Sequence, residues 1–196
     1  MPRDDTDPPS FALLDEPLAY ILAAHLRQRA VCAVLRRFAT DRIAGRTEAD
    51  RMIAFLTGDL RLHHEDEDLD LYPALRRRVL PADGLGVTLA RLGEEHRQGA
   101  AVADFIAEVL SARPADDIVH IDAAAGQAMQ AYAASEMRHL ALENGVVLAL
   151  ARIRLTRPDL RAISRGMKAR RGVDHWLQPL SMFYRKHRPL FDAMGS

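Results

Sequence analysis

Apolar side chains recur at steps of three and four residues along four long stretches of this chain, which is the period of a helix with one buried face. In the second stretch this stripe continues through polar residues without a break, along Ile53, Leu56, Leu60, His63, Glu67 and Leu71. Because the stripe marks the buried face, His63 and Glu67 are predicted to occupy core positions. A fold that buries such groups must supply partners for them.

The other three stretches repeat the pattern, and each has one histidine on its stripe. The inward histidines are His25, His63, His96 and His139. A glutamate follows four residues after two of them, at Glu67 and Glu143. Residues four apart lie above one another on a helix, so each His/Glu pair can reach a common point.

The stretches are rich in Ala, Leu, Arg and Glu and contain no alternating strand pattern, which predicts an all-α fold. The predicted helices cover approximately residues 15–43, 48–73, 85–112 and 115–156. Short connections between them favour an up-down-up-down four-helix bundle. At the boundaries, Gly45 is expected to end the first helix in the left-handed conformation, Thr47 to cap the second, and Pro73 to end or kink it.

The chain is predicted to have three parts. Residues 1–14, rich in Pro and Asp, would form a flexible leader. Residues 15–156 would form the bundle, and residues 157–196 a C-terminal helical extension that packs on it. The extension should open with a helix over approximately 158–170, because Pro158 suits a first helical turn. Further along, His175 and Trp176 are expected to help cover the bundle.

Composition argues against several classes of partner. Lys+Arg and Asp+Glu both number 27, so no net charge draws the chain to nucleic acid or to an anionic membrane. No uninterrupted apolar run approaches the roughly 20 residues of a membrane helix, and the N-terminus lacks the apolar core of a secretory signal. The single cysteine excludes an internal disulfide framework. We therefore expect a cytoplasmic protein without a nucleic-acid or membrane partner, in which the Arg-rich stretch 152–171 is a solvated helix face.

The inward polar residues together predict a metal centre. A single core histidine is usually structural, but two buried carboxylates need neutralising partners, and no Lys or Arg lies on the stripes near them. Imidazole and carboxylate ligands without thiolate suit iron, manganese or zinc, with carboxylates bridging two ions. In a purely structural bundle, replacing His63 and Glu67 with alanine would leave the metal content unchanged.

The motifs resemble those of a known family. The stretch "HHEDEDLDLYPAL" at residues 63–75 resembles the signature of the hemerythrin-like HHE cation-binding domains, and "HLALENGVVLALARIRL" at 139–155 is similar to their fourth helix. The stretches "AAHLRQRAVCAVLRRF" and "EEHRQGA" match the first and third helices, each with one histidine. The resemblance covers approximately residues 15–156 in the family's order of motifs.

The resemblance implies a four-helix bundle around a non-haem di-iron centre. By position, the four inward histidines would be terminal ligands. Glu67 and Glu143 would bridge the two irons together with an oxo, hydroxo or water bridge. Manganese or zinc would suit the same ligands.

The chain also departs from the oxygen-carrying hemerythrins. Those proteins place a second histidine one turn from the first on the third helix, where this chain has Leu92 and Ala100 on either side of His96. They also carry an aspartate five residues after the fourth-helix histidine, whereas here Glu143 follows His139 by four. With one imidazole fewer, each iron is expected to keep an exchangeable water or to recruit another donor, which disfavours reversible oxygen carriage.

The function implied is therefore binding or sensing of dioxygen or a related small oxidant, such as peroxide or nitric oxide. One alternative is a di-iron peroxidase- or oxidase-type enzyme. Another is an iron-handling or regulatory module whose folding and partner binding respond to metal occupancy. The sequence does not identify a protein partner.

A few further residues receive interpretations of their own. Glu136 is interpreted as a residue that orients an imidazole or as a surface residue, and Tyr132 as core filler or as a residue that gates oxygen access. Cys32 is expected to act as a small hydrophobe. The polar residues beside the ligands are expected to lie at the surface or, for the tyrosine, to pack the helix end: His64, Glu65, Asp66, Asp68, Tyr72 and Glu95.

Overall fold

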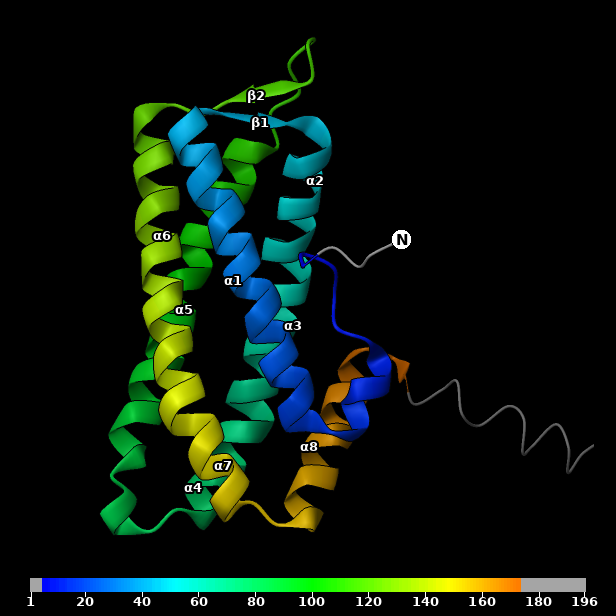
Figure 1. Cartoon of the computed structure of the whole chain (residues 1–196), viewed down its shortest axis with the longest axis vertical. Coiled ribbons are helices and arrows are strands. Elements are labelled where there is room, and N and C mark those ends of the chain that lie inside the picture. Colours follow the sequence, from blue (N-terminus) through cyan, green and yellow to red (C-terminus); the bar gives the residue numbers. More distant parts are fainter. Residues whose placement is uncertain (1–4, 174–196) are drawn as a thin grey trace, which may run out of the picture.

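The computed structural model describes residues 5–173, which form a bundle of four helical rods (Figure 1). The first rod is α1 (Pro17–Asp41). The second rod returns antiparallel to it as five consecutive helical segments: α2 (Arg46–Ala54), the π-helical η2 (Phe55–Asp59), α3 (Leu60–Glu65), the π-helical η3 (Asp66–Leu71) and α4 (Tyr72–Arg78).

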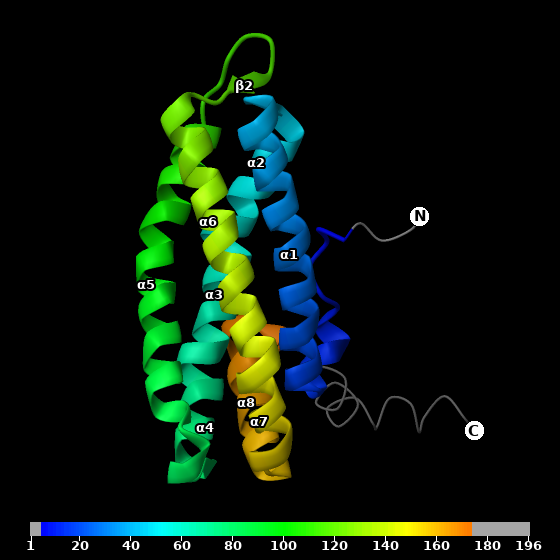
Figure 2. The same cartoon turned by 60° about the vertical axis from the view of Figure 1, so that its left-hand side comes forward.

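The second half of the bundle repeats this course. After the short 3-10 turn η4 (Pro81–Asp83), α5 (Leu85–Leu110) forms the third rod. The fourth rod consists of α6 (Ala123–Leu142), the π-helical η5 (Glu143–Val147) and α7 (Leu148–Arg154). Figures 1 and 2 show the four rods side by side in alternating directions, which confirms the predicted all-α, up-down-up-down bundle.

The core consists of two apolar clusters, one toward each end of the bundle. Along α1, Tyr20 and Ile21 belong to one cluster, Val31 and Cys32 belong to the other, and His25 lies between them. In each of the other rods, too, the polar positions lie between an apolar residue of one cluster and an apolar residue of the other cluster. The fold therefore places the inward histidines and glutamates in one layer between two apolar clusters.

A small β-ribbon closes one end of the bundle and corrects two predicted helix boundaries. Strands β1 (Ile43–Gly45) and β2 (Ile118–His120) pair antiparallel, with Ala44 opposite Val119, and both of these side chains are buried. The fourth rod therefore begins at Ala123 rather than near residue 115, and the side chain of Asp122 caps it by accepting the Ala125 N–H. Strands this short are too brief to show an alternating pattern, so periodicity did not reveal them.

The end of the first helix also differs from the prediction. Helix α1 stops at Asp41 because Arg42, not Gly45, takes the left-handed conformation, with φ 62°. Gly45 is extended, at φ −67°, because it pairs with the other strand and precedes α2 directly. Thr47 consequently lies inside the first turn of α2 rather than at its cap.

Pro73 does not end the second rod, which continues to Arg78. In an α-helix the proline ring would clash with the carbonyl four residues earlier. Here the preceding turn is a π-turn, in which the Tyr72 N–H donates to the carbonyl of Glu67, five residues back. The wider turn accommodates the ring, so the helix passes through the proline.

Helix α1 is the one helix among residues 5–173 whose length and composition would suit a membrane span, with a mean hydropathy of 1.3. Its apolar run is nevertheless interrupted by polar residues, among them His25 and Gln28. Both are buried against other helices. Its packing is therefore that of a core helix in the bundle.

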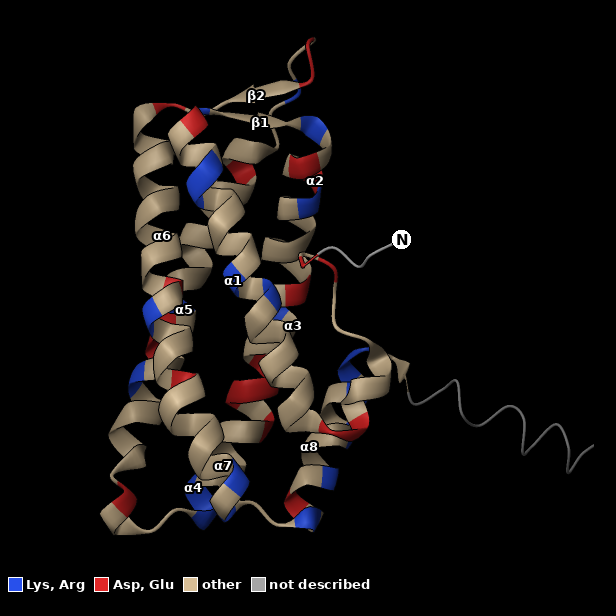
Figure 3. Cartoon of the chain, viewed as in Figure 1, with Lys and Arg blue, Asp and Glu red and all other residues tan. Residues whose placement is uncertain are grey.

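The C-terminal helix α8 (Arg157–Arg170) packs beside α1 and η3 after the four rods. Its first turn has a capping box between Thr156 and Asp159, and Pro158 lies in that turn as predicted. Figure 3 shows basic and acidic residues together along α8. The expected roles of His175 and Trp176 lie outside the described residues.

The predicted leader is described from residue 5. Residues Phe11–Asp15 form the 3-10 turn η1, whose N-terminus is capped by Ser10. Leu14 in this turn is fully buried and belongs to the same apolar cluster as Tyr20.

Candidate metal centre

The six predicted ligand residues converge in the polar layer of the bundle. They form two groups of four: His25, His63, Glu67 and Glu143 in one, and Glu67, His96, His139 and Glu143 in the other. Within each group one nitrogen or carboxylate oxygen from every residue lies within 4.8 Å of the rest, and all six residues are buried. The two groups share both glutamates, which therefore lie between two sets of imidazoles.

The distances across the centre are short. Nε2 of His25 lies 3.1 Å from Oε1 of Glu67 and 3.3 Å from Oε2 of Glu143. In the second group, Nε2 of His139 lies 3.3 Å from Oε2 of Glu143. The Nε2 atoms of His96 and His139 are 3.0 Å apart. The Nε2 atoms of these three rings therefore all point into the centre.

The outer nitrogens of three rings donate to oxygen acceptors. Nδ1 of His25 donates to Oδ1 of Asn144 at 2.8 Å. Nδ1 of His96 donates to Oδ2 of Asp68 at 3.0 Å, and Nδ1 of His139 donates to Oε2 of Glu95 at 2.9 Å. Each acceptor fixes the tautomer, because a proton on Nδ1 of a neutral ring leaves Nε2 with a lone pair.

These lone pairs require a positive partner. In neutral rings, Nε2 of His96 and Nε2 of His139 would face each other as two acceptors, and Nε2 of His25 would face two carboxylates. With the rings neutral, Oε2 of Glu67 and Oε2 of Glu143 are also buried without a hydrogen-bond donor. Either extra protons or cations must lie among these atoms, and imidazole held by an outer carboxylate is the usual arrangement of a metal ligand. The donor set fits a bound cation.

Without a metal, the two glutamates differ in protonation. Burial and the neighbouring Glu143 raise the pKa of Glu67 well above its ordinary value. Burial alone would also raise the pKa of Glu143, but a hydrogen bond from His139 and the nearby imidazoles lower it. For His139, burial opposes protonation, yet its bonds to Glu143 and Glu95 raise its pKa to about 10. In the metal-free centre, protons thus neutralise part of the negative charge that a bound cation would neutralise.

Both shared glutamates lie on π-turns. Glu67 is in η3, and Glu143 opens η5, where the Leu148 N–H donates to the Glu143 carbonyl five residues back. Single π-turns within α-helices are frequent at functional sites. Each wide turn begins at the glutamate or one residue before it, so the i,i+4 spacing between histidine and glutamate is kept.

A comparison with known protein families matches residues 16–151 to the hemerythrin HHE cation-binding domain. The chain belongs to this family. Comparisons with curated proteins and with solved structures found no match. The family assignment confirms the resemblance of the sequence motifs and makes the polar layer of this hemerythrin-like bundle its candidate cation-binding centre.

Two residues expected at the surface, and the tyrosine expected to pack the helix end, contact the centre instead. Asp68 and Glu95 are partly exposed, but each holds the outer nitrogen of a candidate ligand imidazole on the next rod. Tyr72 is buried and its hydroxyl donates to Oε1 of Glu143, so it does more than pack the helix end. Helical periodicity missed these roles because each partner belongs to a different rod.

His64 and Asp66 also differ from the prediction, whereas Glu65 is exposed as expected. The His64 ring is partly buried and stacks on His96, with 4.0 Å between ring centroids. Asp66 is fully buried, and it is bound by Arg170 at the end of α8 and by Arg171, which follows it. The apolar periodicity of one helix predicts which face points to the core, but it does not predict which other faces a further helix will cover.

Three further residues near the centre, Glu136, Tyr132 and Cys32, are all buried. Glu136 is buried and accepts a hydrogen bond from Gln28, outside both four-residue groups. Tyr132 is buried on the same helix, and its hydroxyl has no hydrogen-bond partner. Cys32 is a buried free thiol whose pKa burial raises to about 12, as suits a small core residue.

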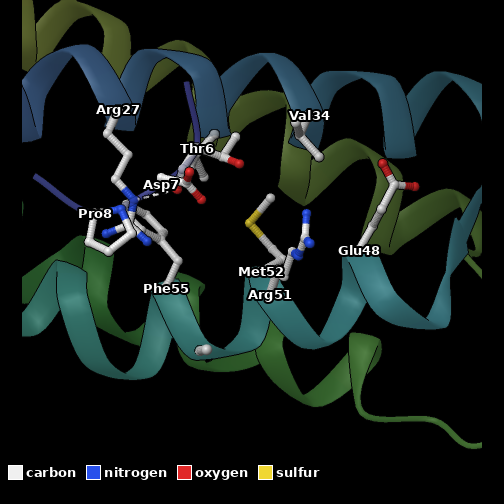
Figure 4. A pocket seen from close by; sticks show the side chains of 11 residues that line it. Thr6, Asp7, Pro8, Arg27, Val34, Glu48, Arg51, Met52 and Phe55 are labelled. Carbon is white, nitrogen blue, oxygen red and sulfur yellow. Dashed lines mark hydrogen bonds between the residues drawn. The ribbon is translucent and has the colours of Figure 1, made fainter. Parts of the chain in front are cut away.

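Several cavities lie along α1. The one shown in Figure 4, about 330 Å³, lies between α1 and α2 beneath the leader and contains none of the six candidate ligands. A smaller one of about 130 Å³ is lined by His63 together with Tyr20, Gln28, Leu60 and Arg171. The smaller cavity therefore reaches a candidate ligand of the centre.

Proposed function

We propose that this hemerythrin-like chain holds a pair of iron ions and binds or senses dioxygen or a related small oxidant such as peroxide or nitric oxide. The observation that carries the proposal is the pair of four-residue groups that share Glu67 and Glu143. Carboxylates common to two sets of imidazoles suit two neighbouring cations. Iron would supply the electrons that reduce a bound oxidant.

The chain itself would hold the ligands and keep water out. Asn144, Asp68 and Glu95 orient three of the imidazoles, and the Tyr72 hydroxyl holds one oxygen of Glu143. The apolar clusters on either side of the polar layer exclude bulk water from it. A dry, rigid donor set favours small neutral ligands over large polar ones.

The size of the cavity at His63 supports a small ligand. About 130 Å³ accommodates a few atoms, and apolar side chains such as Phe55 and Leu60 form much of its wall. The proposal therefore does not extend to a large organic substrate.

Metal analysis of the purified protein tests this function. Protein from iron-supplied cells should carry about two irons per chain, and its optical spectrum should change on reduction and on renewed exposure to air. Glu67→Gln should abolish most of the bound iron because it removes a shared carboxylate. Glu65→Gln is the matched control, since Glu65 is exposed two residues away and should leave the iron content unchanged.

The same measurement separates the alternatives. Spectra that return unchanged over many cycles would indicate reversible binding, and turnover with an added reductant would indicate a peroxidase- or oxidase-type enzyme. Iron that is lost readily, with a change in stability, would indicate an iron-handling or regulatory module. A folded wild-type protein without bound metal would contradict the proposal.

A further inference from the structure

Helix α8 lies beyond the residues that match the family, yet it contacts the segment that carries a shared glutamate. Its last residue, Arg170, donates Nε and Nη2 to Oδ1 of Asp66 at 3.0 and 2.9 Å. Arg171, which follows, donates Nη1 to Oδ1 of Asp66 at 2.9 Å and Nη2 to Oδ2 at 2.6 Å. Both oxygens of the fully buried Asp66 are thus bound from α8.

Further contacts hold the two arginines in place. Arg170 also pairs with Asp70, one turn after Asp66. Nε of Arg171 donates to the Tyr20 hydroxyl at 3.1 Å, and its guanidinium lies over the Tyr20 ring. The cluster contains two cationic and two anionic side chains, so each buried charge has a partner.

Asp66 and Glu67 are consecutive residues of η3 with opposite partners. The carboxylate of Asp66 faces α8, whereas that of Glu67 faces the imidazoles of His25, His63 and His96. Because one peptide unit joins them, a shift of Asp66 also shifts the backbone that presents Glu67. Glu67 belongs to both ligand groups, so this shift would affect both.

We propose that Arg170 and Arg171 are positioning residues for the cation centre, through which α8 holds Glu67 in place by way of Asp66. The affinity for the cation then depends on the contacts of Arg170 and Arg171 with Asp66, at the C-terminal end of α8. This inference rests on cation binding at the proposed centre.

Thermodynamic linkage adds a second consequence. If docked α8 raises the affinity for the cation, the bound cation must stabilise the docking of α8 by the same factor. Binding of a cation inside the bundle would thereby change the stability of α8, a helix outside the residues that match the family.

Titration of metal-free protein with ferrous iron, under anaerobic conditions and against a competing chelator, tests the first consequence. Arg171→Met should raise the dissociation constant about 10- to 100-fold, the usual effect of losing a residue that orients a ligand. The matched control is Arg78→Met. Arg78 binds Asp159 at 2.9 and 3.2 Å in the first turn of α8, away from η3, so its loss weakens the same helix without touching Asp66.

Wild-type affinity in Arg171→Met, or an equal loss in Arg78→Met, would overturn the inference while leaving the proposed function intact. A wild-type chain that binds no iron would overturn both.

Hydrogen exchange on the wild-type protein tests the second consequence without any variant. The backbone amides of α8 should exchange more slowly in the iron-loaded protein than in the metal-free protein, and those of the β-ribbon should change less. Equal exchange rates across α8 in the two forms would overturn the inference.

Discussion

At the scale of single residues, the polar partners of the centre follow a cyclic order around the bundle. Asp68 on the second rod binds His96 on the third, and Glu95 on the third binds His139 on the fourth. Asn144 on the fourth binds His25 on the first. Each acceptor lies next to a candidate ligand in the sequence, so the flank of one rod orients the candidate ligand of the next. The cycle is open at His63, whose Nδ1 is buried without a partner.

Two buried tyrosines provide a matched pair for testing these hydrogen bonds. Tyr72→Phe removes the hydroxyl that donates to Glu143 and leaves a buried carboxylate oxygen unpaired. We expect it to lower the free energy of unfolding of the metal-free protein by about 1.5–3 kcal/mol. Urea denaturation would measure the change.

Tyr132→Phe is the control for that experiment. Its hydroxyl is buried with no hydrogen-bond partner, so its removal should be neutral or stabilising. A larger loss of stability in Tyr132→Phe than in Tyr72→Phe would contradict the hydrogen-bond assignment.

At the scale of elements, the approach of α8 to η3 depends on a glycine. A Cβ at Gly166 would lie 2.3 Å from Oδ2 of Asp70, which Arg170 holds in place. The backbone of α8 therefore lies directly against the Asp70 carboxylate, and a residue with a side chain at position 166 would displace that carboxylate from its contact with Arg170. The π-turn of η3 contributes as well, since it leaves the consecutive residues Asp66 and Glu67 both buried on different sides.

Gly166→Ala should therefore destabilise the protein although alanine favours a helix. The added methyl group should cost about 1–3 kcal/mol by overpacking, which exceeds the gain of up to about 1 kcal/mol in helix propensity. Gly58→Ala is the control, because a Cβ there meets nothing within 4 Å and only the propensity gain remains. Thermal unfolding of both variants would measure this, and a Gly166→Ala protein as stable as Gly58→Ala would refute the close contact.

At the scale of the whole molecule, the middle of the bundle buries ionisable side chains in place of apolar ones. Two apolar clusters flank a layer in which His25, Glu67 and Glu143 have almost no exposed surface. Such a layer costs stability unless protons or cations compensate its carboxylates. The stability of the metal-free protein should consequently depend on pH.

The expected pH dependence follows from His139. Its pKa of about 10 in the folded chain exceeds the ordinary 6.5, so its contribution is complete below about pH 6.5 and is lost as the pH rises to about 10. The raised pKa of Glu67 acts in the same direction, because the unfolded chain loses that proton first. Urea denaturation of chelator-treated protein should show stability falling across this range.

Two variants check the assignment of this pH effect. His139→Gln should flatten the decline, whereas His120→Gln should keep it, since His120 is exposed on β2. Stability that is constant between about pH 6.5 and about pH 10 in the metal-free wild type would contradict the described protonation of the centre.

The sequence by itself determined the four helical rods and the six residues that meet inside them. Helical period is a local property: three- and four-residue steps place a side chain on a face whatever lies opposite. Residues such as His25 and Glu143 could therefore be assigned to the interior from their own helices. The bundle and the family followed from the same pattern.

Only the tertiary structure decided which groups those residues contact. The burial of Asp66, the stacking of His64 on His96 and the bond from Tyr72 to Glu143 each join separate segments of the chain. The short strands depend on the strand with which each one pairs, and the π-turns depend on the spacing of backbone hydrogen bonds. The pattern of apolar residues along one helix shows neither. The physical reason is that a side chain's face is set by its own helix, whereas its partner is set by how the helices pack.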